Sequence, residues 1–476
     1  MLEMGLLKAM YEVAKYIPSA PKPTRRVGLG EKLLWTALAL VLYLIMAHTP
    51  LYGVPWEATR QQQLMILQVV FASHSGTLME LGIGPIVTAG LIMQILAGAK
   101  LIDIDLTDPE DRKIFTGAQK TLGLILAAVQ ATMYVLACRY WPFAGNPIYA
   151  CTASATTRII VALQLFIATL FVMMLDEMIQ KGWGLGSGVS LFILAGVATT
   201  VFWDIFSPIQ VQGVYVGFIP YAASVLSAGG SVSNILLRSG GRDLLGLIAT
   251  FLIIILLIYL NSVRVEIPII TPRLQTIKSK IPLQFLYVAN IPILFIGILY
   301  SNLIVFATIT RTYVGSGALA DLLAKYDSQG RLVGGLAYYL AAPNGLLSAF
   351  SEPAHLIIYS LLVLVFAVIF GIIWVEVAGL NPAMQAQQLL DSGFEVPGFR
   401  RNPKILEQLL ARYIYPLTIL SSLIVGLIAI SADILGAYGS GTGLLLAIGI
   451  LQQYYSLIAY ERTLEAYPML KRLIGE

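Results

Sequence analysis

The chain has 476 residues, of which 58% are apolar and 12% are charged, and its mean hydropathy is +0.80. Soluble domains carry about 25% charged and about half apolar residues, so this composition excludes a soluble enzyme. Thirty Lys and Arg against 26 Asp and Glu leave a net charge of only +4. The positions of the charges along the chain are therefore more informative than their sum.

The first thirty residues predict an interfacial helix and a linker on the cytoplasmic side. Leu6, Met10, Ala14 and Ile17 recur at helical spacing beside lysines. An uninterrupted apolar core and a small-residue cleavage site, which a signal peptide needs, are both missing from this stretch. Residues 1–30 are therefore expected to lie on the membrane surface.

Ten apolar segments follow, and each is expected to span the membrane as a helix. Leu356 to Val375 runs for twenty residues without a charge, which at about 1.5 Å per residue matches a hydrocarbon layer of about 30 Å. The fold class is therefore an all-α polytopic membrane protein. The expected spans are centred near residues 41, 86, 126, 168, 197, 252, 298, 365, 421 and 450.

The charges set the expected orientation. With the amino end in the cytoplasm, the cytoplasmic segments hold 21 Lys or Arg and the external segments hold eight, as the positive-inside bias requires. An even number of spans returns the carboxyl end to the cytoplasm. We expect spans 1–5 in an amino-terminal half over residues 31–225, spans 6–10 in a carboxyl-terminal half over 226–460, and a cytoplasmic tail over 461–476. Halves with five spans each must be inverted relative to one another, and the external stretch between them, Ser207 to Arg242, is expected to be polar.

Two glycine-rich runs are not explained by hydropathy. Gly82, Gly84, Pro85 and Gly90 interrupt the second span, which indicates either a transport path or, more commonly, a close helix-packing surface. The run GWGLGSG, which ends at Gly188, lies between spans four and five. Because no Gly-Lys-Ser/Thr follows it and no strand precedes it, this run favours a tight turn over a phosphate cradle.

Two polar cytoplasmic loops, Asn261 to Gln284 and Gly379 to Arg412, carry eight cations. Positive-inside topology alone explains such charges. The alternative is a docking surface for a polyanion, bound in a salt-dependent way. The cations are Arg264, Arg273, Lys278, Lys280, Arg400, Arg401, Lys404 and Arg412.

Ionisable residues inside the spans are sparse. Glu80 lies near the external end of the second span, whereas Asp176, Glu177 and Glu376 lie at cytoplasmic span ends. Since these residues form no recognisable proton relay, a secondary transporter of a small solute remains the alternative function, not the first. A membrane enzyme is disfavoured because no catalytic constellation is apparent.

Histidines and cysteines are too few for a structural zinc site. His48, His74 and His355 are scattered, and Cys138 and Cys151 lie thirteen residues apart. Both cysteines flank one external loop, so a disulfide between them is conceivable, but two small apolar fillers are the favoured interpretation.

Eight long motifs run along nearly the whole chain. They are KLLWTALALVLYLIM from Lys32, TLMELGIGPIVTAGLIMQIL from Thr77, LDEMIQKGWGLGSGVSLFI from Leu175, VRVEIPIITPR from Val263, VANIPILF from Val288, WVEVAGLNP from Trp374, PGFRR from Pro397 and GSGTGLLL from Gly439. Together they resemble the SecY family, the channel subunit of the Sec protein translocase, in its archaeal version.

The resemblance implies a protein-conducting channel of the cell membrane, with a pore between two inverted halves that opens sideways toward lipid. It implies no cofactor. A ring of six aliphatic side chains would form the constriction, where ions find no replacement for their water but an extended chain can slide. Carried over motif by motif, the pore ring is Ile83, Val87, Val189, Ile193, Leu294 and Leu446.

The resemblance also implies a plug, a gate and partners. A polar cluster at the lateral gate corresponds to Thr88, Gln130 and Asn302, where Gln130 replaces an acid of a related member. The partners implied are small subunits of the SecE type and of the SecG or archaeal beta type, the ribosome, nascent polypeptides with signal sequences, and membrane lipid. The plug would be the short apolar helix with Leu64, Ile66, Leu67, Val70, Phe71 and His74, and the ribosome-docking cations would be Arg264, Arg273, Lys278, Arg400 and Arg401.

Overall fold

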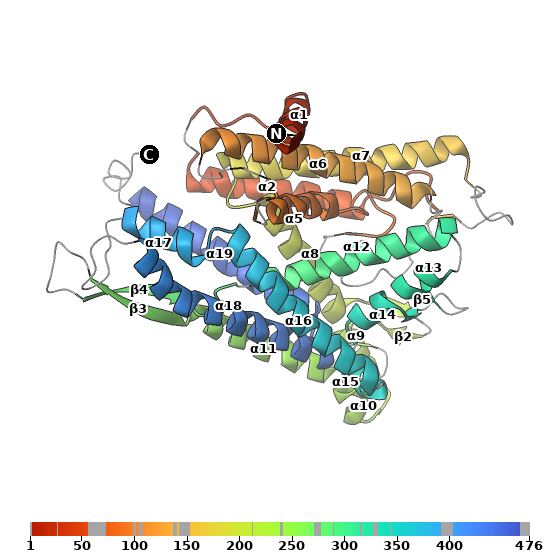
Figure 1. The fold of residues 1–476 in the computed structure, drawn as a ribbon. Coiled ribbons are helices and arrows are strands. Elements are labelled where there is room, and N and C mark those ends of the chain that lie inside the picture. The colour runs from red at the N-terminus through yellow and green to blue at the C-terminus, as the bar shows by residue number, and fades with distance from the viewer. Residues whose placement is uncertain are drawn as a thin grey trace.

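The structure, a computed structural model, is built mainly of long helices (Figure 1). Most of the chain is described, in sixteen ranges separated by short gaps. These are residues 2–25, 27–55, 73–98, 101–102, 104, 108–136, 140–141, 153–211, 213–238, 241–270, 278–288, 290–314, 317–326, 332–343, 345–391 and 403–466.

Every expected span centre falls inside a helix. The ten helices are α2 (Leu29–His48), α5 (Gly84–Gly98), α6 (Pro109–Leu136), α7 (Ala155–Met178), α8 (Gly188–Phe206), α11 (Leu244–Ser262), α12 (Ile291–Val314), α16 (Pro353–Val377), α18 (Pro403–Ile434) and α19 (Gly441–Ala466). Within the described residues, seven of these helices are long and apolar enough to cross a membrane, all except α5, α6 and α12. The chain is therefore a largely helical protein with several candidate membrane spans.

Local chemistry explains where several of these helices begin. Asp243 precedes α11 and accepts a hydrogen bond from the backbone N–H of Gly246 at 2.8 Å, and Ser154 accepts one from Thr157 at 3.1 Å at the start of α7. Such side chains satisfy N–H groups that the first helical turn leaves without partners. α16 begins with Pro353, whose missing N–H is tolerated in the first turn.

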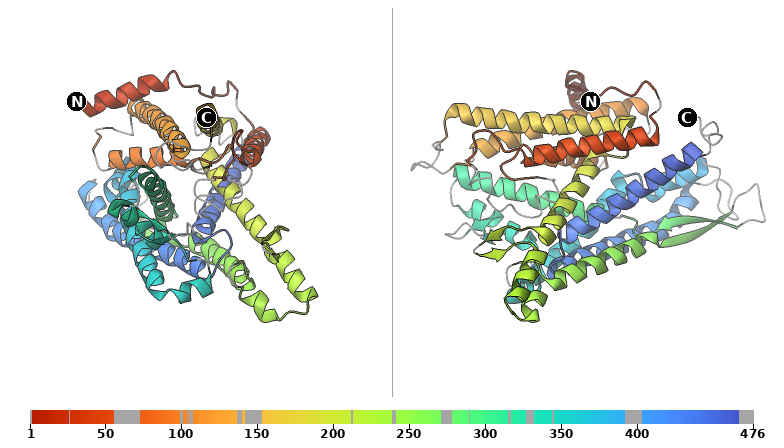
Figure 2. Two further views of the ribbon diagram at one scale, coloured as in Figure 1. Left: turned by 90° about the vertical axis from the view of Figure 1, so that its right-hand side faces the viewer. Right: turned by 180° about the vertical axis from the view of Figure 1, so that it is seen from behind.

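The spanning helices form two groups that follow the chain order. α5 packs on α6 and α6 on α7 in the first group, whereas α12 packs on α16 and α16 on α18 in the second. The groups meet where α8 and α2 contact α19 and where α5 contacts α12 and α16. Two views turned about the vertical axis show the same division (Figure 2).

The shorter elements gather at the two ends of the helix bundle. The hairpin end carries the antiparallel pair of β3 (Arg264–Ile270) and β4 (Lys278–Gln284), which is in register from Arg264 opposite Gln284 to Ile270 opposite Lys278, together with α17 (Pro382–Asp391) (Figure 1). The opposite end carries the pairs β1–β2 and β5–β6 and five short helices. These elements are β1 (Gln210–Val211), β2 (Val214–Tyr215), α9 (Phe218–Ser227), α10 (Val232–Leu236), α13 (Ala318–Leu323), β5 (Lys325–Tyr326), β6 (Leu332–Gly334), α14 (Leu336–Leu340) and α15 (Leu346–Ser351).

The amino-terminal segment begins with the predicted helix, α1 (Leu2–Ala14), which packs on α6, while its position on the membrane surface stays a prediction. Backbone carbonyl groups hold the extended stretch after α1 in place. The Pro18 carbonyl accepts a hydrogen bond from the Lys120 ammonium at 3.0 Å, and the Pro21 carbonyl accepts one from the indole N–H of Trp183 at 2.7 Å. Since proline carbonyls remain free to accept, this stretch is fixed by α6 and by the turn after α7.

Two expectations about the connections differ from the structure. The loop from Asn261 to Gln284 contains a paired hairpin, and in β3 the β-branched Val265 and Ile267 alternate with the charged Arg264 and Glu266, a pattern that favours a strand. The stretch from Ser207 to Arg242 is not simply polar, since it forms α9, α10 and a short hairpin with many exposed apolar side chains. The expected boundary between the halves, after residue 225, falls inside α9.

Candidate functional site

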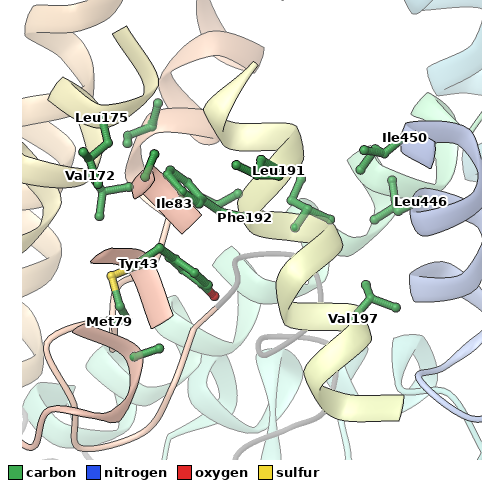
Figure 3. Packing of buried hydrophobic residues seen from close by; sticks show 14 of the residues in the cluster. Tyr43, Met79, Ile83, Val172, Leu175, Leu191, Phe192, Val197, Leu446 and Ile450 are labelled. Carbon is green, nitrogen blue, oxygen red and sulfur yellow. The ribbon is translucent and has the colours of Figure 1, made fainter. Parts of the chain in front are cut away.

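All six side chains of the expected pore ring belong to one apolar cluster between the two helix groups. Ile83, Ile193 and Leu446 are buried, and the other three are half-buried at its edge. They come from the start of α5, the first turns of α8 and α12, and the second turn of α19. Figure 3 shows α8 between the segment that carries Ile83 and the helix that carries Leu446. The fold thus gathers residues that are far apart in the sequence.

The interrupted second span explains how Ile83 reaches the cluster. α5 begins only at Gly84, and the irregular stretch before it includes Gly82 at a φ of +54°, a left-handed conformation that favours glycine. Glu80 is buried in this stretch and accepts a hydrogen bond from the backbone N–H of Gly76. The carboxylate therefore fixes the backbone locally, which accounts for a buried acid without a transport role.

The start of α8 is held by a carboxylate from another helix. Asp176, near the end of α7, accepts hydrogen bonds from the backbone N–H of Val189 at 3.0 Å, from the Ser187 hydroxyl at 3.3 Å and from the Gln180 amide at 2.8 Å. A Cβ at Gly188 would lie 2.7 Å from the Cα of Asp176, so only glycine permits this approach. Asp176 therefore positions Val189, a member of the expected ring.

The glycine-rich turn between these helices is a one-turn π-helix, Ile179–Trp183, followed by bends. Neighbouring helices fasten it: Thr36 of α2 accepts a hydrogen bond from the backbone N–H of Leu185 at 3.0 Å, and the hydroxyl of Tyr454 of α19 donates one to the Ser187 carbonyl at 2.8 Å. The interpretation as a tight turn agrees with this geometry, and the turn connects both helix groups.

Asn290 links the two ring residues of the second group. Its side-chain amide donates a hydrogen bond to the Leu445 carbonyl at 3.3 Å, beside Leu446, while its backbone carbonyl accepts the backbone N–H of Leu294 at 3.2 Å. A Cβ at Gly449 would lie 2.8 Å from the Asn290 amide nitrogen. This close approach places the first turns of α12 against α19.

The expected gate cluster is only partly brought together. Asn302 of α12 donates to the Thr88 hydroxyl of α5 at 3.5 Å, a weak bond across the contact between the helix groups, and also to the Ile298 carbonyl at 3.0 Å. Gln130 is half-buried on α6, and within the described residues no hydrogen bond joins it to Thr88 or Asn302.

Several expected site residues lie outside the described residues. Of the plug, only His74 is described: its backbone N–H donates to the Met79 carbonyl at 3.0 Å, and its ring centroid lies 5.9 Å from that of His48. Arg264 is exposed at the start of β3, and Lys278 begins β4. The predicted site residues and cysteines that lie outside the described residues are Leu64, Ile66, Leu67, Val70, Phe71, Arg273, Arg400, Arg401, Cys138 and Cys151.

Sequence reasoning missed two positioning residues, Asp176 and Asn290. Both lie in the long motifs, but an Asp or Asn in a sequence does not indicate which backbone group it will bind. For Asp176, the available signal was an acid directly after an apolar span, with Gly188 twelve residues further on. For Asn290, it was an amide side chain near the start of VANIPILF. Only the fold shows that each side chain reaches backbone atoms of another helix.

The fold and the site define a polytopic helical membrane protein whose two helix groups meet around aliphatic side chains. Comparison with known proteins supports this class. The SecY family model matches residues 77–455, and that of the plug domain of Sec61p matches residues 41–76. The chain therefore belongs to the SecY family.

Curated relatives match from end to end. The protein translocase subunit SecY of Saccharolobus solfataricus is 46% identical over 99% of this chain and 100% of its own length. That of Aeropyrum pernix is 45% identical over 99% of each chain.

Solved structures agree with the fold. A chain described as a protein-conducting channel has a TM-score of 0.78 and 34% identity, and Sec61 in the canine ribosome-channel complex has a TM-score of 0.75 and 33% identity. Both cover 95% of this chain and 97% of theirs. The function is that of a protein-conducting channel in a membrane, a non-enzymatic one, and the alternative of a small-solute transporter is not supported.

Proposed function

We propose that translocated polypeptides pass through the ring formed by the six aliphatic side chains, Ile83, Val87, Val189, Ile193, Leu294 and Leu446. The observation that carries this proposal is that all six fall into one apolar cluster at the meeting of the helix groups. An aliphatic wall offers no hydrogen bonds, so an extended chain is not held there, while a hydrated ion gains nothing for the water it would lose.

The two helix groups act as two inverted halves of five spans, and they part sideways to release membrane proteins into lipid. Supporting this, α5 contacts α12 and α16, and the only side-chain hydrogen bond between α5 and α12 in the described part of the chain is the weak one from Asn302 to Thr88. A contact held by so little polar bonding can open at low cost. Within the described residues no hydrogen bond joins Gln130 to Asn302 or Thr88, so the proposal gives it no share in this contact.

The hairpin end faces the cytoplasm and binds the ribosome, and both chain ends lie on that side. Arg264 and Arg412 are exposed there, and guanidinium groups suit bidentate contact with phosphates of ribosomal RNA. Arg273, Lys278, Arg400 and Arg401 belong to the same surface by sequence. The apolar helix before His74 acts as the plug, and small subunits of the SecE and SecG or beta types complete the channel in the cell membrane.

Ion leak tests the ring. In planar bilayers, Ile83→Asn and Leu446→Asn should each raise the ion conductance of the resting channel, because an amide holds water in the constriction. Val172→Asn is the matched control: Val172 is a fully buried aliphatic of the same cluster, on α7 and outside the ring.

The control separates a pore from a damaged core. Leak from the two ring variants but not from Val172→Asn supports the ring. Equal leak from all three would show that the cluster is ordinary packing, and no leak from any would place the constriction elsewhere. Gel filtration of each variant shows whether it is folded before conductance is compared.

A further inference from the structure

The segment between α8 and α11 is unusually poor in charge for a connection between spans. From Ile205 to Arg242 it contains no acidic residue and no lysine, and its only cations are Arg238 and Arg242. We call residues 207–237 the connecting segment. A loop that faces water usually carries charged and polar side chains, so this composition calls for an explanation.

α9, the main helix of the connecting segment, is apolar on two faces. Phe218 packs in a small core with Ile235 and Tyr438, and Ala222 and Val225 pack against that core from the same face. The next face carries Ile219, Ala223 and Leu226 at i, i+4 and i+7, and all three are exposed. A helix that is apolar on most sides is stable only when protein or lipid covers it. Nothing in the described chain covers the second face.

Neighbouring elements extend this exposed apolar surface. Val232 and Leu236 stand one turn apart on α10 and are 65% and 44% exposed, against 61% for Leu226 on α9. Ile209 and Val214, beside the β1–β2 hairpin, are exposed as well. Because α9 contacts α10, β2 and α8, these exposed apolar side chains lie on neighbouring elements and are not scattered singly over the surface.

Three polar side chains of α9 bond to backbone carbonyls of the segment itself. The Tyr221 hydroxyl donates to the Asn234 carbonyl at 3.2 Å, and the Ser224 and Ser227 hydroxyls donate to backbone carbonyls one turn earlier. Arg238, the residue directly after the connecting segment, donates to the Tyr215 carbonyl at 2.6 Å and lies 3.9 Å above the Tyr221 ring. Burial lowers the pKa of Arg238. These groups have protein partners and do not depend on water, as an apolar surrounding requires.

The segment continues the lipid-facing side of a spanning helix. Phe202, Trp203 and Phe206 are exposed at the end of α8; the ring of Phe202 lies edge-to-face with that of Trp203 at a centroid distance of 6.2 Å and is tilted against that of Phe206 at 4.9 Å. Aromatic rings gather in membrane proteins at the level of the lipid headgroups. The connecting segment begins at the next residue, and Figure 2 shows it at the edge of the molecule, beside the ends of α8 and α11.

We propose that the connecting segment is a membrane-surface anchor that lies in the lipid interface at this end of the bundle. Ile219, Leu226, Val232 and Leu236 enter the boundary between headgroups and acyl chains. Lipid is favoured over a protein partner because α9 contacts α8, whose last turns expose aromatic residues, and because residues 207–237 contain no charged group for specific pairing. The segment is thereby held at a fixed depth, independently of the pore.

Lipid-borne quenchers test the anchor in the full-length chain, reconstituted in phosphatidylcholine vesicles. With Cys138 and Cys151 replaced by alanine, an environment-sensitive fluorophore is attached to Leu226→Cys, and separately to Ile219→Cys in case the first variant fails to fold. Leu252→Cys, on the exposed face of α11, is the lipid reference, and Lys325→Cys, exposed on β5 at the same end of the bundle, is the water reference.

The anchor predicts a blue-shifted emission at both test positions and a larger loss of fluorescence with a nitroxide near the head of the acyl chain than with one near its end. Leu252→Cys should show the reverse preference, and Lys325→Cys should respond only to aqueous iodide. Quenching of the test positions by iodide alone would show that the segment faces water and would overturn the proposal. Shielding from both quenchers would overturn it in favour of a protein partner, another copy included.

Discussion

Removing the Asp176 carboxylate should destabilise the protein far more than removing an ordinary helix cap. Asp176 is buried and accepts three hydrogen bonds, one of them from the backbone N–H of Val189 in the first turn of α8. In Asp176→Ala that N–H loses its partner inside the protein, and the negative charge at the amino end of α8 is lost as well.

The magnitude follows from these contacts. A buried donor left without a partner costs about 1–3 kcal/mol, and an anion at a partly buried helix start contributes up to about 2 kcal/mol. The Ala variant should therefore lose about 3 kcal/mol of unfolding free energy, about a hundredfold in the folding equilibrium. Asp176→Asn keeps an acceptor for the N–H of Val189, and the Gln180 amide can turn so that its oxygen accepts from the new Asn side chain. The Asn variant should therefore lose only about 1 kcal/mol of unfolding free energy.

Unfolding in mixed micelles with increasing dodecyl sulfate, followed by tryptophan fluorescence, measures these losses. Asp108→Ala is the control, because Asp108 is an exposed carboxylate that accepts the backbone N–H of Glu110 at 3.0 Å at the start of α6. It should cost no more than about 1 kcal/mol. If Asp176→Ala lowers the unfolding free energy no more than Asp108→Ala does, the reasoning is refuted. If Asp176→Asn is as unstable as Asp176→Ala, an acceptor at this position does not restore the bond to Val189, and the geometric part of the reasoning is wrong.

Three further outcomes follow from other contacts. Tyr359→Phe should lower the unfolding free energy by about 1–2 kcal/mol, since it removes the 2.7 Å bond to buried Asp433; an unchanged midpoint in the same assay would contradict it. Arg242→Ala should cost about 3 kcal/mol by leaving Asp204, now 2.9 Å from Arg242, unpaired and largely buried; the double variant with Asp204→Asn should recover part of the loss. Arg264→Glu should weaken ribosome binding most at low salt, where screening is least, and equal affinity in pull-downs at every ionic strength would leave Arg264 a topology signal only.

Hydropathy predicted the position of the helices better than the form of their connections. A span must bury about twenty residues in lipid, so its apolar run is long enough to locate α16 or α11 from composition alone. The connecting segment misled the same reasoning, because serines and glycines lower its mean hydropathy while α9 keeps its apolar residues on two faces. Average polarity over a window does not report which face of a short helix those residues occupy.

The residues of the expected ring, in contrast, could not be selected from the sequence pattern alone. Ile83 with Val87, and Val189 with Ile193, each lie four residues apart, but aliphatic pairs at that spacing occur on almost every membrane helix, so only the family resemblance could select them. The structure adds the physical reason for their convergence. Polar groups at the start of each helix, the Asp176 carboxylate for α8 and the Asn290 amide between α12 and α19, fix the backbone beside an apolar residue. Aliphatic side chains make no directional bonds of their own, so their convergence in the proposed ring depends on these hydrogen bonds to the neighbouring backbone.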